Sequence, residues 1–161
     1  MNNIQVAIMM GSQSDLPTMQ EAAKVLKEFG IPYEIRVLSA HRTPRETAEY
    51  AQGLKARGVK VVIAGAGGSA ALAGVVAAYT TIPVIGIPIE TTALNGMDSL
   101  LSTVQMPPGV PVAAVAIGKS GAQNAGLLAV RILSLTDNGL ETKLEKFRDD
   151  QRKKILETTV E

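Results

Sequence analysis

Apolar residues along the chain fall into short runs that are separated by longer segments with a helical spacing. The first run, residues 4–10, lacks strict alternation of polar and apolar positions, which is typical of a strand covered on both faces. In the next segment apolar residues recur with a helical period until Gly30, which ends the predicted helix. Continued along the chain, the pattern predicts strands at 4–10, 33–38, 59–64, 83–89 and 112–117, and helices at 16–29, 44–57, 70–79, 95–104 and 121–135.

Strands that alternate with helices in this way predict an α/β fold, with a parallel five-stranded sheet, helices on both faces and right-handed crossovers. The loops rich in glycine, serine and charge follow the carboxyl ends of the strands, where ligands bind in such sheets. If the strand order is 2-1-3-4-5, the loops after the first and third strands flank the point where the order reverses. The loop after the second strand then lies beside them.

The chain has 161 residues, 46% of them hydrophobic, which fits one domain with a substantial core. We expect a core of residues 1–135 and a helical tail of residues 136–161. The segments 70–78 and 125–130 are apolar nearly all round, and the tail carries an apolar stripe on a charged helix, so we expect these parts to contact other subunits. The stripe comprises Leu140, Leu144, Phe147, Gln151 and Ile155.

Charge and composition exclude several classes of function. Sixteen basic and fifteen acidic residues give a net charge of +1, and no basic block outside the tail indicates nucleic-acid binding. The lack of cysteine and the single histidine argue against disulfides, thiolate nucleophiles and a metal centre of cysteine or histidine ligands. No charged leader and no apolar run of membrane-spanning length is present. We therefore expect a cytoplasmic protein that binds neither metal nor membrane.

The stretch from Ser39 to Pro44 holds the one histidine, His41, with Arg42 directly beside it. Histidine is the side chain whose ordinary pKa lies nearest neutrality. The segment Thr43-Pro44-Arg45-Glu46 has the pattern of a capping box, with Thr43 as the N-cap of the next helix. Unpaired N–H groups at a helix N-terminus favour anions, and the guanidinium of Arg42 strengthens that preference. This loop is therefore a candidate anion site with a titratable imidazole.

Two further loops have suitable chemistry. Ser12, Ser14 and the N-terminal amides of the first helix can bind a phosphate, although ordinary N-capping explains the two serines equally well. Asp15 can cap the helix or accept hydrogen bonds from ribose hydroxyls. Residues 65–69, Gly-Ala-Gly-Gly-Ser, lack large side chains, so their backbone can approach a ligand. Together the three loops predict a site for a sugar phosphate.

Other nucleotide-binding motifs fit poorly. A dinucleotide fingerprint needs three spaced glycines after the first strand, where only Gly11 is present, and a Walker loop needs a Gly-Lys-Ser/Thr sequence that is missing. A response regulator needs an aspartate where Ala64 stands. A flavin- or nucleotide-binding module stays open, because residues 12–18 could bind a flavin phosphate. Three tyrosines, two phenylalanines and no tryptophan, however, offer few aromatic neighbours to a flavin ring.

Several blocks of sequence resemble the 5-(carboxyamino)imidazole ribonucleotide mutases of purine biosynthesis, and the similarity extends from Val6 to about Leu133. The histidine block is the most specific of them. The blocks are Gly11-Ser12-Gln13-Ser14-Asp15, Ser39-Ala40-His41-Arg42-Thr43-Pro44, Ala64-Gly65-Ala66-Gly67-Gly68, Pro83-Val84-Ile85-Gly86, and Gly96-Met97-Asp98-Ser99-Leu100-Leu101 with Val104-Gln105-Met106-Pro107.

This resemblance implies a flavodoxin-like three-layer domain that assembles as a homo-octamer and uses neither metal nor organic cofactor. It also implies a reaction in which the carboxylate of a carbamate on the substrate's exocyclic nitrogen moves to the neighbouring ring carbon. Carbon dioxide is the implied intermediate, and 4-carboxy-5-aminoimidazole ribonucleotide is the product. Residues 105–109 are apolar and proline-stiffened, and we interpret them either as a lid over the substrate or, equally, as a static connection.

The resemblance also assigns roles to individual residues. His41 would carry the proton, as an acid toward the carbamate nitrogen and then as a base toward the ring carbon. Ser12, Ser14 and Arg42 would hold the phosphate, and Asp15 would hold the ribose. The pocket for the base and the carboxylate would be lined by Ser39, Ala40, Gly67, Gly68, Ala70 and Leu72.

One departure from the family pattern bears on the reaction. Bacterial mutases usually carry His-Leu-Pro-Gly where this chain has Ala71-Leu72-Ala73-Gly74. The related carboxylases, which add free carbon dioxide to aminoimidazole ribonucleotide, also lack that histidine, so a carboxylase is the alternative. Their glycine loop usually reads Arg-Ser-Asn, whereas Gly68-Ser69-Ala70 and the block 96–107 are closer to the mutases. The sequence therefore favours a mutase.

Overall fold

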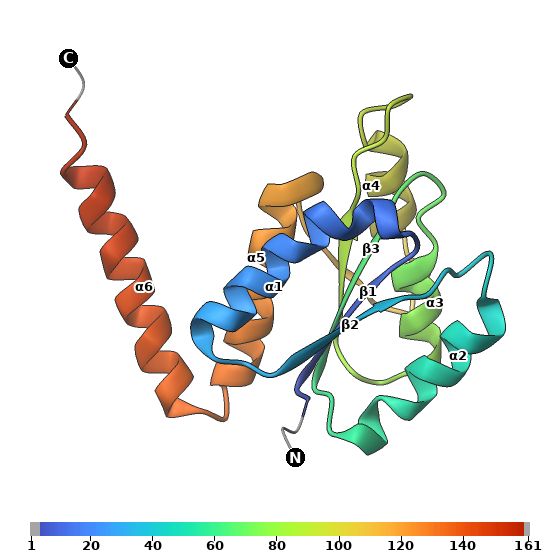
Figure 1. The fold of residues 1–161 in the computed structure, drawn as a ribbon, viewed down its shortest axis with the longest axis horizontal. Helices are drawn as coiled ribbons and strands as arrows, with labels where there is room; N and C mark the ends of the chain where they lie inside the picture. The colour runs from blue at the N-terminus through green and yellow to red at the C-terminus, as the bar shows by residue number, and fades with distance from the viewer. Residues whose placement is uncertain (1–3, 160–161) are drawn as a thin grey trace.

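The computed structural model describes residues 4–159 and has a central parallel sheet between two layers of helices (Figure 1). Its strand order is β2-β1-β3-β4-β5, and every neighbouring pair is parallel, which confirms the predicted flavodoxin-like arrangement. The strands are β1 (Val6–Met10), β2 (Tyr33–Val37), β3 (Val61–Ala66), β4 (Val84–Pro88) and β5 (Ala113–Ala114).

Helices α1 and α5 cover one face of the sheet, and α2, α3 and α4 cover the other (Figure 1). Two short 3₁₀ turns, η1 and η2, precede α1 and follow α2. The bounds are η1 (Gln13–Asp15), α1 (Leu16–Phe29), α2 (Pro44–Gly53), η2 (Lys55–Arg57), α3 (Leu72–Tyr79), α4 (Met97–Val104), α5 (Gly118–Ser134) and α6 (Asn138–Leu156).

The strand β1 explains why the first apolar run lacks alternation. All five of its residues are fully buried. Val6, Ile8 and Met10 pack with α1 and α5 on one face, while Ala7 and Met9 pack with α2 and α3 on the other. A strand with helices on both faces has no solvent side on which to place polar residues.

Several element boundaries differ from those predicted by the sequence. The edge strand β5 pairs only Ala113 and Ala114 with β4, and the chain then turns into α5 at Gly118 instead of residue 121. The helix α2 ends at Gly53, and the tighter turn η2 replaces its predicted last turn. The helix α3 begins at Leu72, after backbone turns at residues 68–71. These ends depend on tertiary contacts that a hydrophobic period does not encode.

The edge strand β2 is tied to α2 by a polar cluster around Glu34. The Tyr50 hydroxyl donates to Glu34 at 2.7 Å, the Arg57 guanidinium forms an ion pair with the same carboxylate, and the Arg57 guanidinium carbon lies 5.0 Å from the centroid of the Tyr50 ring. Burial by itself would raise the pKa of Glu34, but hydrogen bonds from Arg57 and Tyr50 and the nearby cationic charge outweigh it and lower the pKa. The cluster therefore fixes the β2–α2 unit whose connecting loop holds His41.

The segment 125–130 is covered within this chain. Ala125, Gly126, Ala129 and Val130 are buried in the cluster that α5 forms with α1 and the sheet. A Cβ atom on Gly126 would lie 2.8 Å from the Cβ of Val25, so the missing side chain allows this close approach of the two helices. In α3, by contrast, Leu72, Ala73 and Val76 face the core while Tyr79 is exposed.

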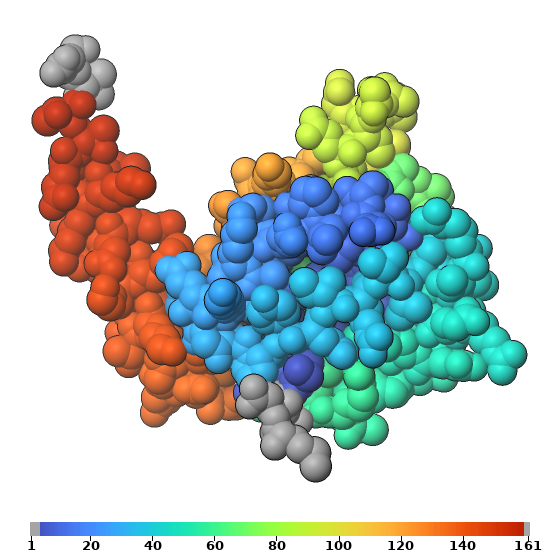
Figure 2. All heavy atoms as spheres, viewed as in Figure 1, coloured from blue at the N-terminus to red at the C-terminus, as the bar shows by residue number. Residues whose placement is uncertain are grey.

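The helix α6 packs on the domain near its start and then extends away from it (Figures 1 and 2). Leu140 and Leu144 are buried against α1 and α5, and the Phe147 ring meets Phe29 edge-on with the centroids 5.8 Å apart. Ile155, in contrast, is 74% exposed. The first half of the stripe thus packs on this chain's own core. Contact with another subunit stays a prediction for the distal half of the tail.

None of the helices formed by residues 4–159 combines the length and the apolar character needed to cross a lipid bilayer.

Candidate functional site

The register of the sheet brings three loops to one level at its carboxyl edge. Met10 pairs with Val37 of β2 and with Gly65 of β3, so the three strands end side by side. Their following loops enclose a cavity of about 390 Å³ at the point where the strand order reverses. The cavity is lined by Gly11, Ser12, Asp15, Ser39, Ala40, His41, Arg42, Ala66, Gly67, Ser69, Ala71 and Leu72.

The loop after β1 is a compact polar turn. The Ser12 hydroxyl accepts hydrogen bonds from the Ser14 amide at 3.4 Å and from the Ser14 hydroxyl at 2.9 Å, and so caps η1. Asp15 occupies the N-cap position of α1, but its carboxylate makes no capping hydrogen bond. Capping therefore accounts for the serines but not for Asp15, whose carboxylate lines the cavity.

Burial raises the pKa of Asp15 above its ordinary value, against the opposing effects of hydrogen bonds from Ser12 and Ser14 and of the Arg42 charge. The smallest of these effects is the charge of Arg42, which belongs to the loop after β2. A carboxylate that is partly desolvated and beside a cation is suited to accept hydrogen bonds from sugar hydroxyls.

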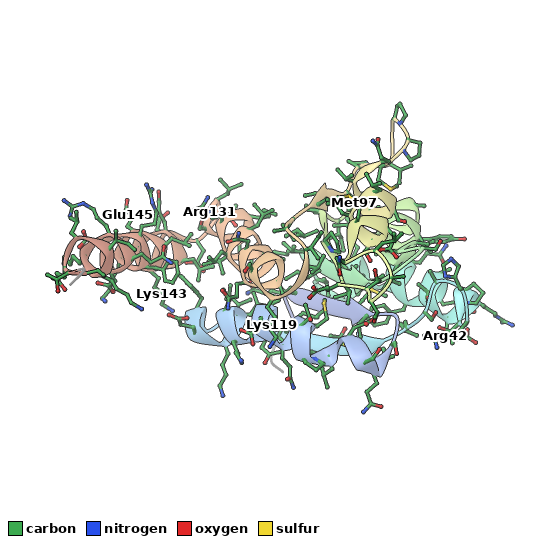
Figure 3. All side chains as sticks on the ribbon, turned by 90° about the horizontal axis from the view of Figure 1, so that it is seen from above. Arg42, Met97, Lys119, Arg131, Lys143 and Glu145 are labelled. Carbon is green, nitrogen blue, oxygen red and sulfur yellow. The ribbon has the colours of Figure 1, made fainter. Side chains whose placement is uncertain are left out.

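Arg42 links the first two loops directly. Its Nη2 donates to the Gly11 carbonyl at 2.7 Å, and its Nε donates to the Ser39 hydroxyl at 3.4 Å. The side chain is nevertheless exposed, at the end of the molecule opposite to α6 (Figure 3). These bonds orient the planar guanidinium before a ligand arrives, and a guanidinium has five N–H donors, so donors remain for an anion.

The predicted capping box at Thr43 is wrong in its side-chain contacts, although Thr43 is the N-cap of α2 by position. Its hydroxyl turns back to the loop, accepts from the Ser39 amide at 2.8 Å and donates to the Ser39 carbonyl at 3.1 Å. The fully buried Thr47 hydroxyl donates to the same carbonyl at 3.3 Å. The threonines therefore fix the loop that precedes His41, and the helix end is left without a side-chain cap.

His41 lines the mouth of the cavity and is exposed. In the sequence, His41 is flanked by Arg42 on one side and by the small residues Ser39 and Ala40 on the other. His41 thus belongs to the lining of the cavity, and a side chain that transfers protons must lie within reach of the ligand.

The third wall of the cavity is the glycine loop after β3. Gly67 and Leu72 line the cavity, whereas Gly68 and the buried Ala70 do not. Gly68 has φ 66°, a left-handed conformation that favours glycine. Its amide and carbonyl are both held by serine hydroxyls of α4.

Eight of the eleven predicted site residues line the cavity, and Ser14, Gly68 and Ala70 lie on the same loops but do not line it. The structure adds Gly11, Ala66, Ser69 and Ala71 to the lining. All four belong to or adjoin the sequence blocks already described, but three have no functional group on the side chain. Their contribution to the lining follows from their position on the loops. The types of residue in the sequence do not reveal it.

A larger groove of about 870 Å³ lies at the amino edge of β4 and β5, between the ends of α2 and α3 and the loop before β5. Lys55 is the one charged residue in its lining, which contains no histidine or acid. Gly109 lines this groove, and none of residues 105–109 lines the cavity that holds His41. Within one chain, therefore, the segment 105–109 does not cover the candidate site.

Comparisons with known proteins agree with this arrangement. The family model described as AIR carboxylase matches residues 5–154. The chain is 56% identical to the N5-carboxyaminoimidazole ribonucleotide mutase of Bacillus subtilis (strain 168) over 154 residues, 96% of this chain and 95% of that one. It is 58% identical to the Pyrococcus abyssi protein of the same name over 149 residues, 92% of this chain and 84% of that one.

A crystal structure of Treponema denticola PurE superposes with a TM-score of 0.87 and 34% identity, over 95% of this chain and 94% of that one. The match of sequence and of fold identifies the chain as a member of the AIR carboxylase family.

Proposed function

We propose that this chain is an N5-carboxyaminoimidazole ribonucleotide mutase of purine biosynthesis, in which His41 transfers the protons. The observation that carries the mechanism is the position of His41, in one cavity with Arg42 and the glycine loop. The curated relatives named as mutases support the reaction. The proposed reaction needs no cofactor, since the carboxylate moves within the substrate and His41 transfers the protons. The cytoplasmic location stays an expectation.

In the proposed reaction the His41 imidazolium donates a proton to the carbamate nitrogen. The bond between that nitrogen and the carboxylate carbon breaks, its electron pair stays on nitrogen, and carbon dioxide is released into the cavity. The ring carbon next to the amino group attacks carbon dioxide and forms the new carbon–carbon bond. His41, now neutral, removes the proton from that ring carbon. Such positioned proton transfer contributes about a hundredfold to ten-thousandfold to the rate.

Binding is divided among the loops. The phosphate lies at Arg42 and at the turn of Ser12 and Ser14, where hydroxyls and helix amides converge. The carboxylate of Asp15 accepts hydrogen bonds from the ribose. The base and the migrating carboxylate lie against small residues, which leave room for the ring and keep water away from carbon dioxide. Of the residues expected to form this pocket, Ser39, Ala40, Gly67 and Leu72 line the cavity, and Gly68 and Ala70 belong to the same glycine loop without lining it.

A carboxylase is the second candidate because Ala71 lines the cavity, where mutases usually have a histidine. A methyl group in place of an imidazole removes a hydrogen-bonding group and leaves space for water beside the carboxylate. A flavin module has less support, since no aromatic ring other than His41 lines the cavity.

The proposed assembly is a homo-octamer. Its support in this chain is an apolar stripe on the outer side of α4, formed by Met97, Leu101 and Val104, which are 52%, 50% and 48% exposed. Met97 is labelled in Figure 3, and the preceding segment with Leu94, yellow-green in Figure 2, stands up from the surface. Contiguous exposed apolar side chains of this kind mark contact sites.

The substitution His41→Asn is expected to lower kcat by about a hundredfold to ten-thousandfold, because the asparagine amide cannot carry a proton. The exposed position of His41 predicts that fold and thermal midpoint stay those of the parent. Steady-state rates and a thermal melt measure both effects. A variant with most of the parent rate would contradict the proposed role.

The substitution Arg42→Lys is expected to raise KM by about tenfold to a hundredfold, since lysine keeps the charge but loses the fork. Removing the phosphate from the substrate should then raise KM by a smaller factor in this variant than in the parent. Arg45→Lys is the matched control, because Arg45 pairs with Glu49 on the outside of α2. Equal losses in Arg42→Lys and the parent would mean that Arg42 does not bind the phosphate.

Isotopic label in the carbamate distinguishes the two candidate reactions. For a mutase with Ala71, we expect most of the label to reach the product, some to be lost to the medium, and Ala71→His to reduce that loss. A carboxylase would incorporate label from bicarbonate into aminoimidazole ribonucleotide. Adding the carbamate substrate would not increase its rate. Complete exchange of the label with dissolved carbon dioxide before product forms would replace the mutase assignment with the carboxylase.

The substitution Leu101→Glu is expected to reduce the mass of the assembly in light scattering, because it places a charge in the proposed contact. Gln20→Glu, which adds the same charge to an exposed position of α1, should leave the mass unchanged. A Leu101→Glu protein with the parent's mass and thermal midpoint would exclude the α4 stripe from the assembly contact.

A further inference from the structure

The helix α4 contributes no side chain to the cavity, yet it holds the glycine loop that forms one wall. The Gly68 amide donates to the Ser99 hydroxyl oxygen at 2.9 Å, and the Ser102 hydroxyl donates to the Gly68 carbonyl at 3.2 Å. More than thirty residues of sequence separate the partners in each bond. Both the amide and the carbonyl of Gly68 are therefore held by side chains of α4.

The two bonds are not equivalent. The Gly68 carbonyl also accepts a hydrogen bond from the Ala70 amide at 2.8 Å, so it keeps a partner without Ser102. For the Gly68 amide, Ser99 is the one acceptor found within residues 4–159. Ser99 is fully buried, whereas Ser102 is exposed. Loss of the Ser99 hydroxyl would leave the amide of the half-buried Gly68 without this partner, and the loop would lose one hydrogen bond to α4.

The start of α4 is itself fixed behind the loop. The Thr91 hydroxyl donates to Asp98 at 2.6 Å and accepts from the Gly96 amide at 3.2 Å. A Cβ atom on Gly67 would lie 3.5 Å from Cγ2 of Thr91, so this same segment forms the backing of the cavity wall. Ser99 thus extends from a rigid element, which is a requirement for accurate positioning.

We propose that Ser99 is a positioning residue that holds Gly68 in its left-handed conformation and so keeps residues 67–71 closed over the released carbon dioxide. This role rests on the proposed function, because carbon dioxide is an intermediate of that reaction. Gly67, Ser69 and Ala71, on either side of Gly68, all line the cavity. A loop freed at Gly68 opens the wall that separates the intermediate from water.

The test compares Ser99→Ala with Thr103→Val. Thr103 is a matched control, since its hydroxyl is also buried on α4 and donates to the Ser99 carbonyl at 2.7 Å, but it does not contact the glycine loop. In Ser99→Ala we expect the fraction of carbamate label lost to the medium to rise about threefold to tenfold relative to the parent, the range that one hydrogen bond supports. Thr103→Val is expected to lose no more label than the parent.

Hydrogen exchange supplies a readout that does not depend on the reaction. Amides in the peptide that covers residues 66–71 should exchange about threefold to tenfold faster in Ser99→Ala than in the parent, and at the parent's rate in Thr103→Val. Ser102→Ala should give the smaller effect, because the Gly68 carbonyl keeps its bond from Ala70. If Ser99→Ala fails to fold, Ser99→Cys, which replaces the hydroxyl by a larger and weaker acceptor, is measured in its place.

Parent-like exchange and parent-like label retention in Ser99→Ala would overturn the proposal, and so would equal effects of Ser99→Ala and Thr103→Val. Faster exchange with unchanged label loss would also overturn it, because the clamp would then have no effect on carbon dioxide. If the parent fails to convert the carbamate substrate, the proposed function fails, and the role of Ser99 toward carbon dioxide falls with it. Exchange data alone then report whether Ser99 holds the loop.

Discussion

The parallel pairing of β1 on both of its edges is the constraint on which the site depends. Because β1 lies between β2 and β3 in matched register, the ends at Met10, Val37 and Gly65 stand at one level. The order reverses at β1, so the connections to α1 and to α3 leave on opposite faces and open a crevice between them. The cavity is a consequence of topology, and the side chains on the loops then determine its chemistry.

Glycine at the end of β3 allows the first helix to start close to this crevice. A Cβ atom on Gly65 would collide with the sulfur of Met19, which is fully buried on α1. The turn of Ser12 and Ser14 therefore lies directly beside the sheet, and Ser12 lines the cavity without a long loop. Close approach of backbone thus brings the loop after β1 to the other two loops.

The sequence predicted the sheet, its helices and most of the cavity lining, because these follow from periodic burial and from loops at the ends of strands. It could not predict the role of Thr43, whose spacing to Glu46 fits a helix cap. The Ser39 backbone competes for the same hydroxyl, and that competition arises only when β2 places the loop. The role of Ser99 was hidden for the same reason, since its partner Gly68 belongs to another βα unit.

Hydroxyl groups that bind backbone are the common feature of two cavity walls. Thr43 holds both polar backbone groups of Ser39, and Ser99 with Ser102 holds both of Gly68. These bonds are made within the protein, so the shape of the cavity does not depend on a ligand. A wall fixed in this way cannot collapse to fill the space beside the short side chain of Ala71. The space beside Ala71 is therefore expected to stay open to a ligand or to water, rather than being removed by a shift of the loop.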